Sequence, residues 1–206
     1  MSRIDRRIYL VSRSPRRREL LKQIGVHFEV LMLRTTPEER ADVDEQVLAG
    51  EVPADYVMRV ARIKAEFGWR RVVDRHLPAL AVLGADTTVA LGDEIFGKPD
   101  DAEHACAILE RLSGQEHCVY TAIALAFEQR VEAALSCTRV KFRKLDSAEI
   151  RRYAATGEPM DKAGAYAIQG KAACFVSELN GSYSGVMGLP LFETAQLLNR
   201  FGYLLP

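Results

Sequence analysis

The chain has 206 residues, 48% of them hydrophobic, and this length suits one α/β domain, spanning residues 1–206, with a buried core. Its 28 Lys and Arg residues are balanced by 28 Asp and Glu residues, whereas a protein that lives on long nucleic acid usually carries a basic excess. Any anion-binding site must therefore be local.

The elements expected in the first half begin with a short buried strand at Ile8–Val11. Ser14 and Pro15 then start a helix that ends at Gly25, because serine caps helices and proline suits the first helical position. The pattern continues with a strand at 27–33, a polar and acidic loop at 34–52, a helix at 53–69 and a strand at 80–91.

Hairpins dominate the second half of the pattern. A Gly-Asp turn at 92–93 leads into a strand at Glu94–Phe96, and a longer hairpin joins 118–127 to 131–142. The other expected elements are helices from Asp100 to Gly114, from Asp146 to Gly157 and around Leu191 to Leu198, and strands at 165–169 and 174–179. The antiparallel pairs argue against a purely parallel sheet and predict a mixed one.

The first candidate site is the stretch SRSPRRREL, residues 12–20. The free N–H groups and the dipole of a helix N-terminus favour anions. Acidic residues usually occupy such a first turn, but Arg16, Arg17 and Arg18 stand there, and arginine suits phosphate oxygens. The pattern fits a phosphate site and equally fits arginines that only face solvent, as we expect for Arg18.

Lys64 falls on the apolar stripe of the helix expected at 53–69, four residues after Val60. Most lysines in such a position carry their ammonium out to the surface. A lysine in line with a buried face is nevertheless a candidate site residue.

Asp86 interrupts an apolar strand, and burying a carboxylate is costly unless it is paired or binds a metal. If the following turn has two residues, Leu91 pairs with Glu94, and Lys98 falls opposite Thr87, next to Asp86. This hairpin would bring a base or metal ligand close to a hydroxyl and a phosphate-binding lysine. A structural Asp–Lys pair at the end of a sheet explains the same pattern.

The third candidate site is the segment GEPMDKAGAYAIQG, residues 157–170. Its glycines and its proline indicate an irregular loop that other groups approach closely. Gln169 can both donate and accept hydrogen bonds, so it could read the edge of a base. An ordinary loop amide is the alternative.

Several familiar motifs are absent from the sequence. It has no phosphate-binding G-x-x-x-x-G-K-[ST] loop and no H-E-x-x-H metal motif, and in GSYSG the residue Tyr183 stands where a nucleophilic serine would be. The four histidines have no short spacing, and the four cysteines form no C-x-x-C pair. Attack by water is therefore favoured over a covalent enzyme intermediate.

The cysteines and the N-terminus together predict a location. Widely spaced cysteines are typical of free thiols in a reducing compartment. The N-terminus lacks the apolar segment of a signal peptide, and no apolar run is long enough to span a bilayer. These features predict a cytoplasmic protein without a membrane partner.

Taken together, these segments resemble the Maf family of nucleotide pyrophosphatases. The matching stretches cover most of the chain in the family's order, which makes the set specific although each piece alone is weak. They are SRSPRRRELL, DVDE, YVMRVARIKA, LGADTTV, GKPDDAEHACAILERLSGQEHCVYTAIAL, YAATGEPMDKAGAYAIQGKAACFV and GSYSGVMGLPLFET. The family's S-x-S-P-R-R motif is met by Ser12, Ser14, Pro15, Arg16 and Arg17.

The resemblance implies an α/β fold in which helices flank a mixed sheet and two lobes surround a cleft. It also implies hydrolysis of nucleoside triphosphates to the monophosphate and pyrophosphate, assisted by a divalent cation, Mg²⁺ or Mn²⁺. The segment DKAGAYAIQG is similar to the subgroup that acts on dTTP and UTP and differs from the subgroup that acts on 7-methyl-GTP.

By motif match, the resemblance makes Asp86 the proton acceptor. It links Arg16, Thr87 and Gln169 to substrate choice, and it places Glu45, Lys64 and Lys98 at the family's other charged positions. We expect Arg16, Lys64 and Lys98 to hold the phosphates of a nucleoside triphosphate. A metal held by Asp86 and Glu45 would activate the water, and direct proton transfer to Asp86 is the alternative.

Two other classes of function fit the sequence less well than hydrolysis. One is a non-catalytic nucleotide-binding regulator of cell division, a role historically attached to the family. In such a protein, the negative charge of Asp86 beside a bound phosphate would not strengthen binding. A nucleic-acid-binding protein would use Arg3, Arg6, Arg7 and Arg13, but the zero net charge disfavours it. A homodimer is compatible with this sequence.

Overall fold

A computed structural model describes residues 7–33 and 43–205 of the chain. Within them, one seven-stranded sheet has the order β2-β1-β3-β5-β6-β7, and β4 pairs with β3. Strand β1 runs parallel to β2 and β3, and the other pairs are antiparallel, so the expected mixed sheet is confirmed. The strands are β1 (Ile8–Val11), β2 (Phe28–Val30), β3 (Val82–Leu91), β4 (Glu94–Phe96), β5 (Glu116–Phe127), β6 (Arg130–Phe142) and β7 (Val176–Asn180).

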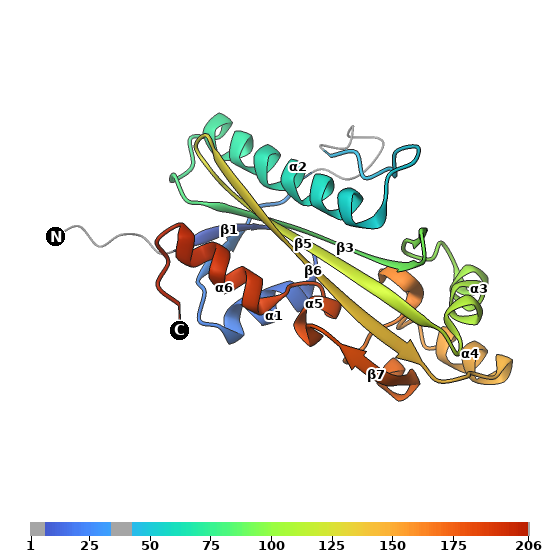
Figure 1. The fold of residues 1–206 in the computed structure, drawn as a ribbon. Coiled ribbons are helices and arrows are strands. Elements are labelled where there is room, and N and C mark those ends of the chain that lie inside the picture. Colours follow the sequence, from blue (N-terminus) through green and yellow to red (C-terminus); the bar gives the residue numbers. More distant parts are fainter. Residues whose placement is uncertain (1–6, 34–42, 206) are drawn as a thin grey trace.

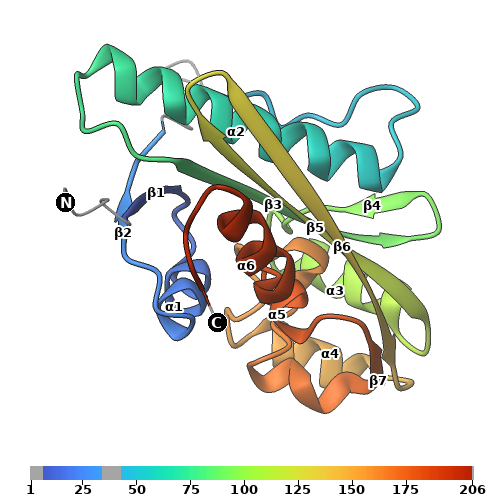
Figure 2. The ribbon, with the colours of Figure 1, turned by 60° about the vertical axis from the view of Figure 1, so that its left-hand side comes forward.

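Helices cover both faces of this sheet. Helix α2 lies along one face, and α1 and α6 lie on the other (Figure 1), while β2 and β4 occupy distant parts of the molecule (Figure 2). The helices are α1 (Pro15–Gln23), α2 (Pro53–Asp74), α3 (Ala102–Leu112), α4 (Ser147–Ala154), α5 (Tyr183–Val186) and α6 (Leu191–Arg200), with 3-10 helices η2 (Ala163–Ala165) and η3 (Lys171–Phe175). Among the described helices, none is long and apolar enough to cross a membrane.

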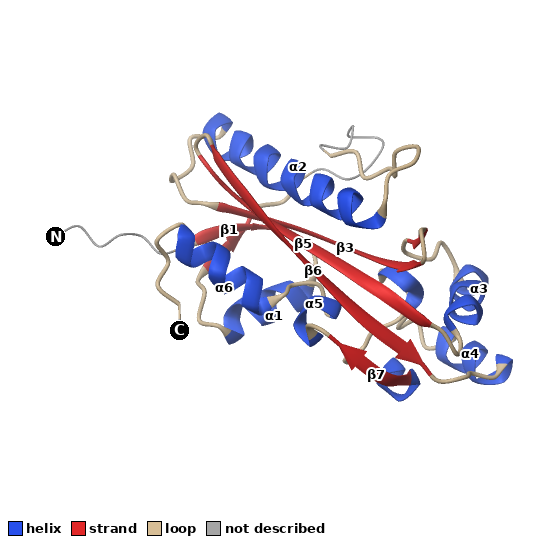
Figure 3. Cartoon of the chain, in the orientation of Figure 1, coloured by secondary structure: helices blue, strands red, loops and turns tan. Residues whose placement is uncertain are grey.

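The long central strands belong to two separate cores. At one end, Leu83 and Leu125 pack in a cluster with residues of α1 and α6. At the other end, Val89, Val119 and Val140 pack in a cluster with residues of α3 and α4. The long strands β5 and β6 join the two groups of helices (Figure 3), so two lobes share one sheet and leave a cleft between them.

Two glycines bring α2 unusually close to the sheet. A Cβ atom on Gly84 of β3 would lie 2.6 Å from the carbonyl oxygen of Ala61 and 2.7 Å from the amide nitrogen of Ala65, both in the backbone of α2. A Cβ atom on Gly68 of α2 would lie 2.7 Å from side chains of β1 and β3. Any larger residue at either position would push the helix away from the strand.

One predicted strand is wrong and another is displaced. Residues 165–169 form no strand, because Ala165 ends η2 with φ of 57° and the Gly170 amide closes a turn on the carbonyl of Ala167 at 3.0 Å. The segment is apolar because it is buried against the second core, and a Cβ atom on Gly164 would lie 2.6 Å from the side chain of Val89. The strand expected at 174–179 is β7, preceded by η3.

The remaining differences are shifted ends of elements and one helix that was not expected. The strand expected at 27–33 is shortened to β2, and the helix expected to end at 69 continues to Asp74. The described part of the expected loop, residues 43–52, contains no helix or strand, and residues 34–42 lie outside the described residues. Helix α5 was not expected, and Ser182 caps it by accepting a hydrogen bond from the Gly185 amide.

The second core contains a buried histidine. His117 is 2% exposed, and its Nε2 lies 2.9 Å from the hydroxyl of Tyr166. Its ring also meets that of Phe142 edge-on. Because burial disfavours the charged ring, the pKa of His117 is lowered to about 4.

Because His117 is buried in its neutral form, we expect the free energy of unfolding to fall in acid. An unfolded chain would protonate the same residue near its ordinary pKa of about 6.5, so the unfolded state binds more protons between the two values. The stabilisation is fully present above pH 6.5 and is lost as the pH falls toward 4, by about 3 kcal/mol. We expect His117→Gln, which retains an acceptor for Tyr166, to flatten this dependence in urea unfolding followed from pH 7 to pH 4. His27→Gln at an exposed position is the control. An unchanged slope in His117→Gln would contradict the assignment.

Candidate active site

A cleft of about 1380 Å³ lies between the two lobes. The start of α1, one side of α2, the second half of β3, the end of β4, the η2 segment and the end of α5 all contribute to its walls. The residues singled out from the sequence all line it: Ser12, Ser14, Arg16, Arg17, Glu45, Lys64, Asp86, Thr87, Lys98 and Gln169. The fold therefore brings the three sequence stretches together in one cavity.

At the α2 side of the cleft, one ammonium lies between two carboxylates. Nζ of Lys64 is 2.8 Å from Oδ1 of Asp86 and 3.0 Å from Oε1 of Glu45. The side chains of Lys64 and Asp86 are 13% and 9% exposed, whereas that of Glu45 is 46% exposed. Lys64 therefore does not extend to the outer surface, and its charge is held inside the cleft.

The close packing of α2 on β3 sets this pair in place. Asp86 lies two residues after Gly84, so both face α2. Lys64 lies between the two α2 residues that Gly84 approaches, and its own Cβ would be 3.1 Å from a Cβ atom on that glycine. The missing side chain at position 84 thus fixes how far Lys64 stands from Asp86.

Gly84→Ala is therefore expected to separate Lys64 from Asp86. The added methyl would meet helix backbone, which cannot rotate away, so we expect a loss of about 1–3 kcal/mol in the free energy of unfolding together with lower activity. Urea unfolding and steady-state kinetics on the same preparation measure both effects. In Gly97→Ala the new Cβ would have no neighbour within 4 Å, so its unfolding free energy should stay near that of the unmodified chain. Equal stabilities for the two variants would contradict this explanation.

Thr87 points to the opposite face of β3 from Asp86, because successive strand residues alternate. Its hydroxyl oxygen accepts a hydrogen bond from Nη2 of Arg17 at 3.1 Å and lies 3.0 Å from the hydroxyl of Thr121. That second hydroxyl also lies 2.8 Å from the carbonyl oxygen of Gly185. Thr87 thus joins β3 to α1, β5 and α5 at the wall of the cleft.

Arg17 is fully engaged with the protein around it. Its Nε donates to the carbonyl of Gly188 at 2.7 Å, and its Nη1 donates to the carbonyl of Ala85 at 2.9 Å and to the hydroxyl of Ser12 at 3.4 Å. Burial lowers its pKa, and the negative charge of Asp86 opposes that change. Arg17 therefore fixes the start of α1 against β3 and adds a positive charge beneath the cleft.

Arg16 and Lys162 are two further cations that line the cleft. Nε of Arg16 donates to the carbonyl of Met187 at 3.4 Å, and Nζ of Lys162 donates to the carbonyl of Met160 at 3.3 Å. Neither side chain forms an ion pair with any residue in the described ranges. Burial lowers the pKa of Lys162, and the positive charge of Arg16 lowers it further.

Lys162 was not singled out from the sequence. It lies in the segment DKAGAYAIQG, but nothing in that segment distinguishes its lysine from a solvated one. Only the fold, by placing the η2 segment across from α1, puts Lys162 in the electrostatic field of Arg16. The two cations repel each other, the Asp161 carboxylate opposes that effect at both, and an anion bound between them would oppose it further.

The expected pairing of Lys98 with Thr87 is wrong. The β3–β4 register is the predicted one, but the pairing ends at Phe96. The carbonyl of Gly97 instead accepts a hydrogen bond of 3.0 Å from the amide of Gly164. Lys98 is consequently an exposed side chain that lines the cleft without a hydrogen bond to any described residue.

Polar side chains at two edges of the cleft are also available to a ligand. Ser14 precedes α1, and its hydroxyl makes no capping hydrogen bond, while its amide donates to the hydroxyl of Ser12 at 3.1 Å. Gln169 is exposed, and its amide bonds to no other described residue.

Arg18, expected to face solvent, is half-buried, and its Nη2 donates to the carbonyl of Arg13 at 3.4 Å.

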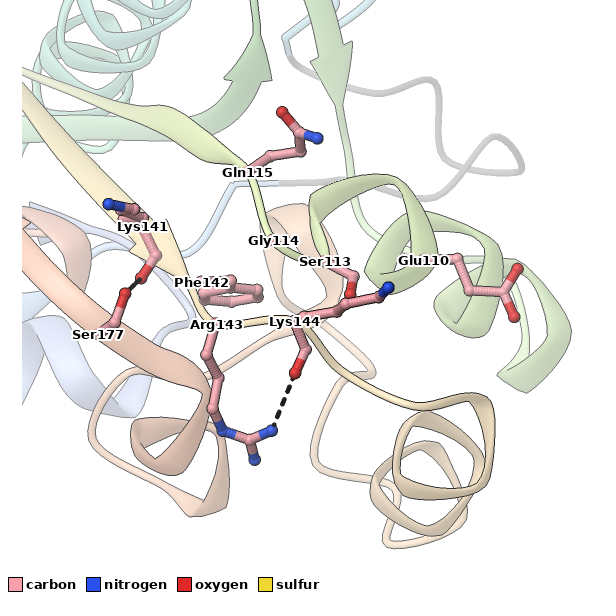
Figure 4. A pocket seen from close by; sticks show the side chains of 9 residues that line it. All are labelled: Glu110, Ser113, Gly114, Gln115, Lys141, Phe142, Arg143, Lys144 and Ser177. Atoms are coloured by element: carbon pink, nitrogen blue, oxygen red, sulfur yellow. Dashed lines mark hydrogen bonds between the residues drawn. The ribbon is translucent and has the colours of Figure 1, made fainter.

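A second hollow, of about 650 Å³, lies at the start of β5 and the end of β6 (Figure 4) and shares no lining residue with the cleft. Its arginine and one of its lysines already have protein partners: Arg143 pairs with Glu149, and Lys141 pairs with Glu178. None of the candidate site residues lines it. The larger cleft is therefore the candidate active site.

Residues 7–201 match the model of the family described as Maf-like protein. A protein of Aromatoleum aromaticum named dTTP/UTP pyrophosphatase is 59% identical over 98% of this chain and 99% of its own. A protein of the same name from Nitrosomonas europaea is 57% identical over 95% of this chain and 94% of its own. Another, from Chromobacterium violaceum, is 51% identical over 100% of both chains. Among solved structures, the Ham1 protein of Staphylococcus aureus matches 66% of this chain and 71% of its own, with 12% identity and a TM-score of 0.46. The chain belongs to the Maf family.

Proposed function

We propose that this protein is a nucleoside triphosphate pyrophosphatase that hydrolyses dTTP and UTP to the nucleoside monophosphate and pyrophosphate. The names of its relatives support this activity and these substrates. The observation that carries the proposal is the buried carboxylate of Asp86 in a cleft whose lining has six Lys and Arg side chains and four Asp and Glu side chains. Cations can bind the triphosphate, and a buried carboxylate among them can act as a general base or as a ligand for a metal ion.

The phosphates would lie between the start of α1 and Lys64. Arg16 and Lys162 on one wall, and Lys98 at the rim, have N–H groups that no described residue accepts. The first amides of α1 and the hydroxyl of Ser14 offer further donors to an anion. Holding the phosphates against Lys64 fixes the scissile bond in front of the carboxylate of Asp86.

Asp86 would accept the proton of the attacking water. Lys64 bonds to its Oδ1, and its Oδ2 bonds to no described residue, so one oxygen is oriented while the other can receive a proton. On the far side of the cleft, Gln169 would hydrogen-bond the edge of the pyrimidine. Thr87 acts by fixing Arg17 and the strand that carries Asp86.

Glu45 would hold a divalent cation, Mg²⁺ or Mn²⁺, and Asp86 would hold it too in the alternative arrangement, in which its Oδ2 ligates the cation instead of accepting the proton. The described residues contain no cluster of three metal-ligating side chains, but Mg²⁺ is usually bound through one or two carboxylates together with substrate phosphates. Two carboxylates that already share one ammonium fit that requirement. When bound, the cation would neutralise phosphate charge and lower the pKa of a coordinated water.

We place this activity in the cytoplasm. The support is the state of the cysteines, all four of which are free thiols in the described residues. Free thiols suit a reducing compartment.

A triphosphate panel tests the proposed function. The purified protein is incubated with dTTP, UTP, dCTP, dATP, dGTP and 7-methyl-GTP in Mg²⁺ and in Mn²⁺, and pyrophosphate release is followed. We expect dTTP and UTP to be the fastest substrates, and EDTA to abolish the reaction. Fastest turnover of 7-methyl-GTP would contradict the pyrimidine assignment, and no turnover of any triphosphate would contradict the enzymatic function.

A further inference from the structure

Side chains of α2 hold the loop that carries Glu45. The loop, residues 43–52, has no helix or strand, yet it presents the Glu45 carboxylate 3.0 Å from Lys64. The hydroxyl of Tyr56 donates to the carbonyl of Glu45 at 3.0 Å, and Nη2 of Arg59 donates to the carbonyl of Gln46 at 2.8 Å. Two consecutive loop carbonyls are thus bound by side chains from adjacent turns of one helix.

Arg59 also binds Glu51, near the other end of the same loop. Its Nε and Nη2 bind the two carboxylate oxygens of Glu51 at 2.6 and 2.8 Å. Glu51 in turn accepts a hydrogen bond of 3.0 Å from the amide of Leu48, and its side chain is only 9% exposed. Two parallel hydrogen bonds between a guanidinium and a carboxylate form a strong and geometrically specific pair. One side chain therefore ties residues 46, 48 and 51 to α2.

The electrostatics agree with this geometry. The hydrogen bond from Arg59 lowers the pKa of Glu51 to about 2, so the pair stays charged across the neutral range. Burial, and after it the negative charges of Asp86 and Glu45, raise the pKa of Tyr56, so its hydroxyl remains a donor. Neither Arg59 nor Glu51 lines the cleft.

We propose that Arg59 is a positioning residue, which clamps the loop to α2 through Glu51 and Gln46 and thereby sets the Glu45 carboxylate against Lys64 and Asp86. The inference rests on the proposed function, in which Glu45 helps to hold the cation. Arg59 does not line the cleft, so it acts on the reaction through its neighbours, which are the loop and the ring of Tyr56, 5.7 Å from its guanidinium carbon.

A double-mutant cycle between Arg59 and Glu45 tests the proposal. We expect Arg59→Met to lower kcat for dTTP about tenfold and to raise the Mn²⁺ concentration that gives half-maximal rate. In a Glu45→Gln background, the same change should cost less than twofold, because the group that it positions is already lost. Arg59→Lys should fall between, since an ammonium cannot keep both bonds to Glu51.

Arg62 provides the matched control, because it is exposed on the same helix and forms no ion pair with any part of the chain that is described. Arg62→Met is expected to keep the kinetics of the unmodified protein. Hydrogen exchange of the amides at 43–52 supplies a readout without turnover. It should speed up in Arg59→Met and in Glu51→Gln, while exchange in β3 and β5 stays unchanged.

The outcomes separate this inference from the proposed function. If the unmodified protein hydrolyses dTTP but Arg59→Met costs the same factor in the Glu45→Gln background as in the unmodified chain, the positioning role is overturned and the enzymatic function stands. If the unmodified protein hydrolyses no triphosphate, the proposed function fails. Unchanged exchange at 43–52 in Arg59→Met would overturn the clamp in either case.

Discussion

Asp86→Asn is expected to lower kcat for dTTP hydrolysis by about 10²- to 10⁴-fold. Asparagine has nearly the shape of aspartate, but it cannot accept the proton of the attacking water and is a weaker ligand for a divalent cation. KM should change much less, because the cations that bind the phosphates remain in place. Steady-state kinetics across a range of dTTP concentrations measure both parameters.

Asp86→Asn should remain folded, and Asp93→Asn is its matched control. Lys64 keeps Glu45 as a partner, so we expect Asp86→Asn to cost no more than about 1–2 kcal/mol in the free energy of unfolding. Asp93→Asn makes the same chemical change in the exposed turn before β4 and should leave kcat unaltered. If Asp86→Asn turned over dTTP within about threefold of Asp93→Asn, the role assigned to Asp86 would be wrong.

Lys64→Met is expected to have the second largest effect. Methionine keeps the length of the side chain but removes the charge that orients Asp86 and would bind a phosphate oxygen. A lost hydrogen bond between charged groups is worth about 1.5–3 kcal/mol, so kcat/KM should fall about 10- to 100-fold. Unlike Asp86→Asn, this variant should raise KM as well as lower kcat.

Lys144→Met is the control for this change, because Lys144 is exposed at the second hollow and lies outside the cleft. We expect it to bind and hydrolyse dTTP like the unmodified protein. Lys64→Arg keeps the charge, but its planar fork does not suit two single carboxylate oxygens at 2.8 and 3.0 Å, so it should restore only part of the activity. Equal kcat/KM for the methionine variants at positions 64 and 144 would contradict a role for Lys64.

Local signals were enough to predict most of the elements. The serine and proline at 14 and 15 start α1, and the two-residue turn after Leu91 gives the observed β3–β4 register. Residues 165–169 were predicted to form a strand because a short apolar run has the same pattern in a buried strand and in a buried irregular segment. Ala165 has φ of 57°, and the preceding Gly164 closely approaches the side chain of Val89, a contact between distant positions that a short sequence window cannot contain.

The members of the site could be named from the sequence, but their contacts could not. Arg16 and Arg17 are adjacent in the chain, yet the Nη atoms of Arg16 bond to no described residue, while Arg17 is bound to three carbonyl or hydroxyl groups from distant segments and to one from its own turn. Lys98 and Lys162 depend on how the η2 segment crosses β4, a long-range contact. The position of Lys64 depends on Gly84, twenty positions later in the chain.

The identity of the products tests the central claim most directly. Phosphorus NMR of dTTP incubated with the protein and Mg²⁺ distinguishes cleavage between the α- and β-phosphates from removal of the terminal phosphate. We predict dTMP and pyrophosphate in equal amounts, formed by the unmodified protein and not by Asp86→Asn on the same timescale. Formation of dTDP and orthophosphate, or equal product formation by both proteins, would contradict pyrophosphate release in this cleft.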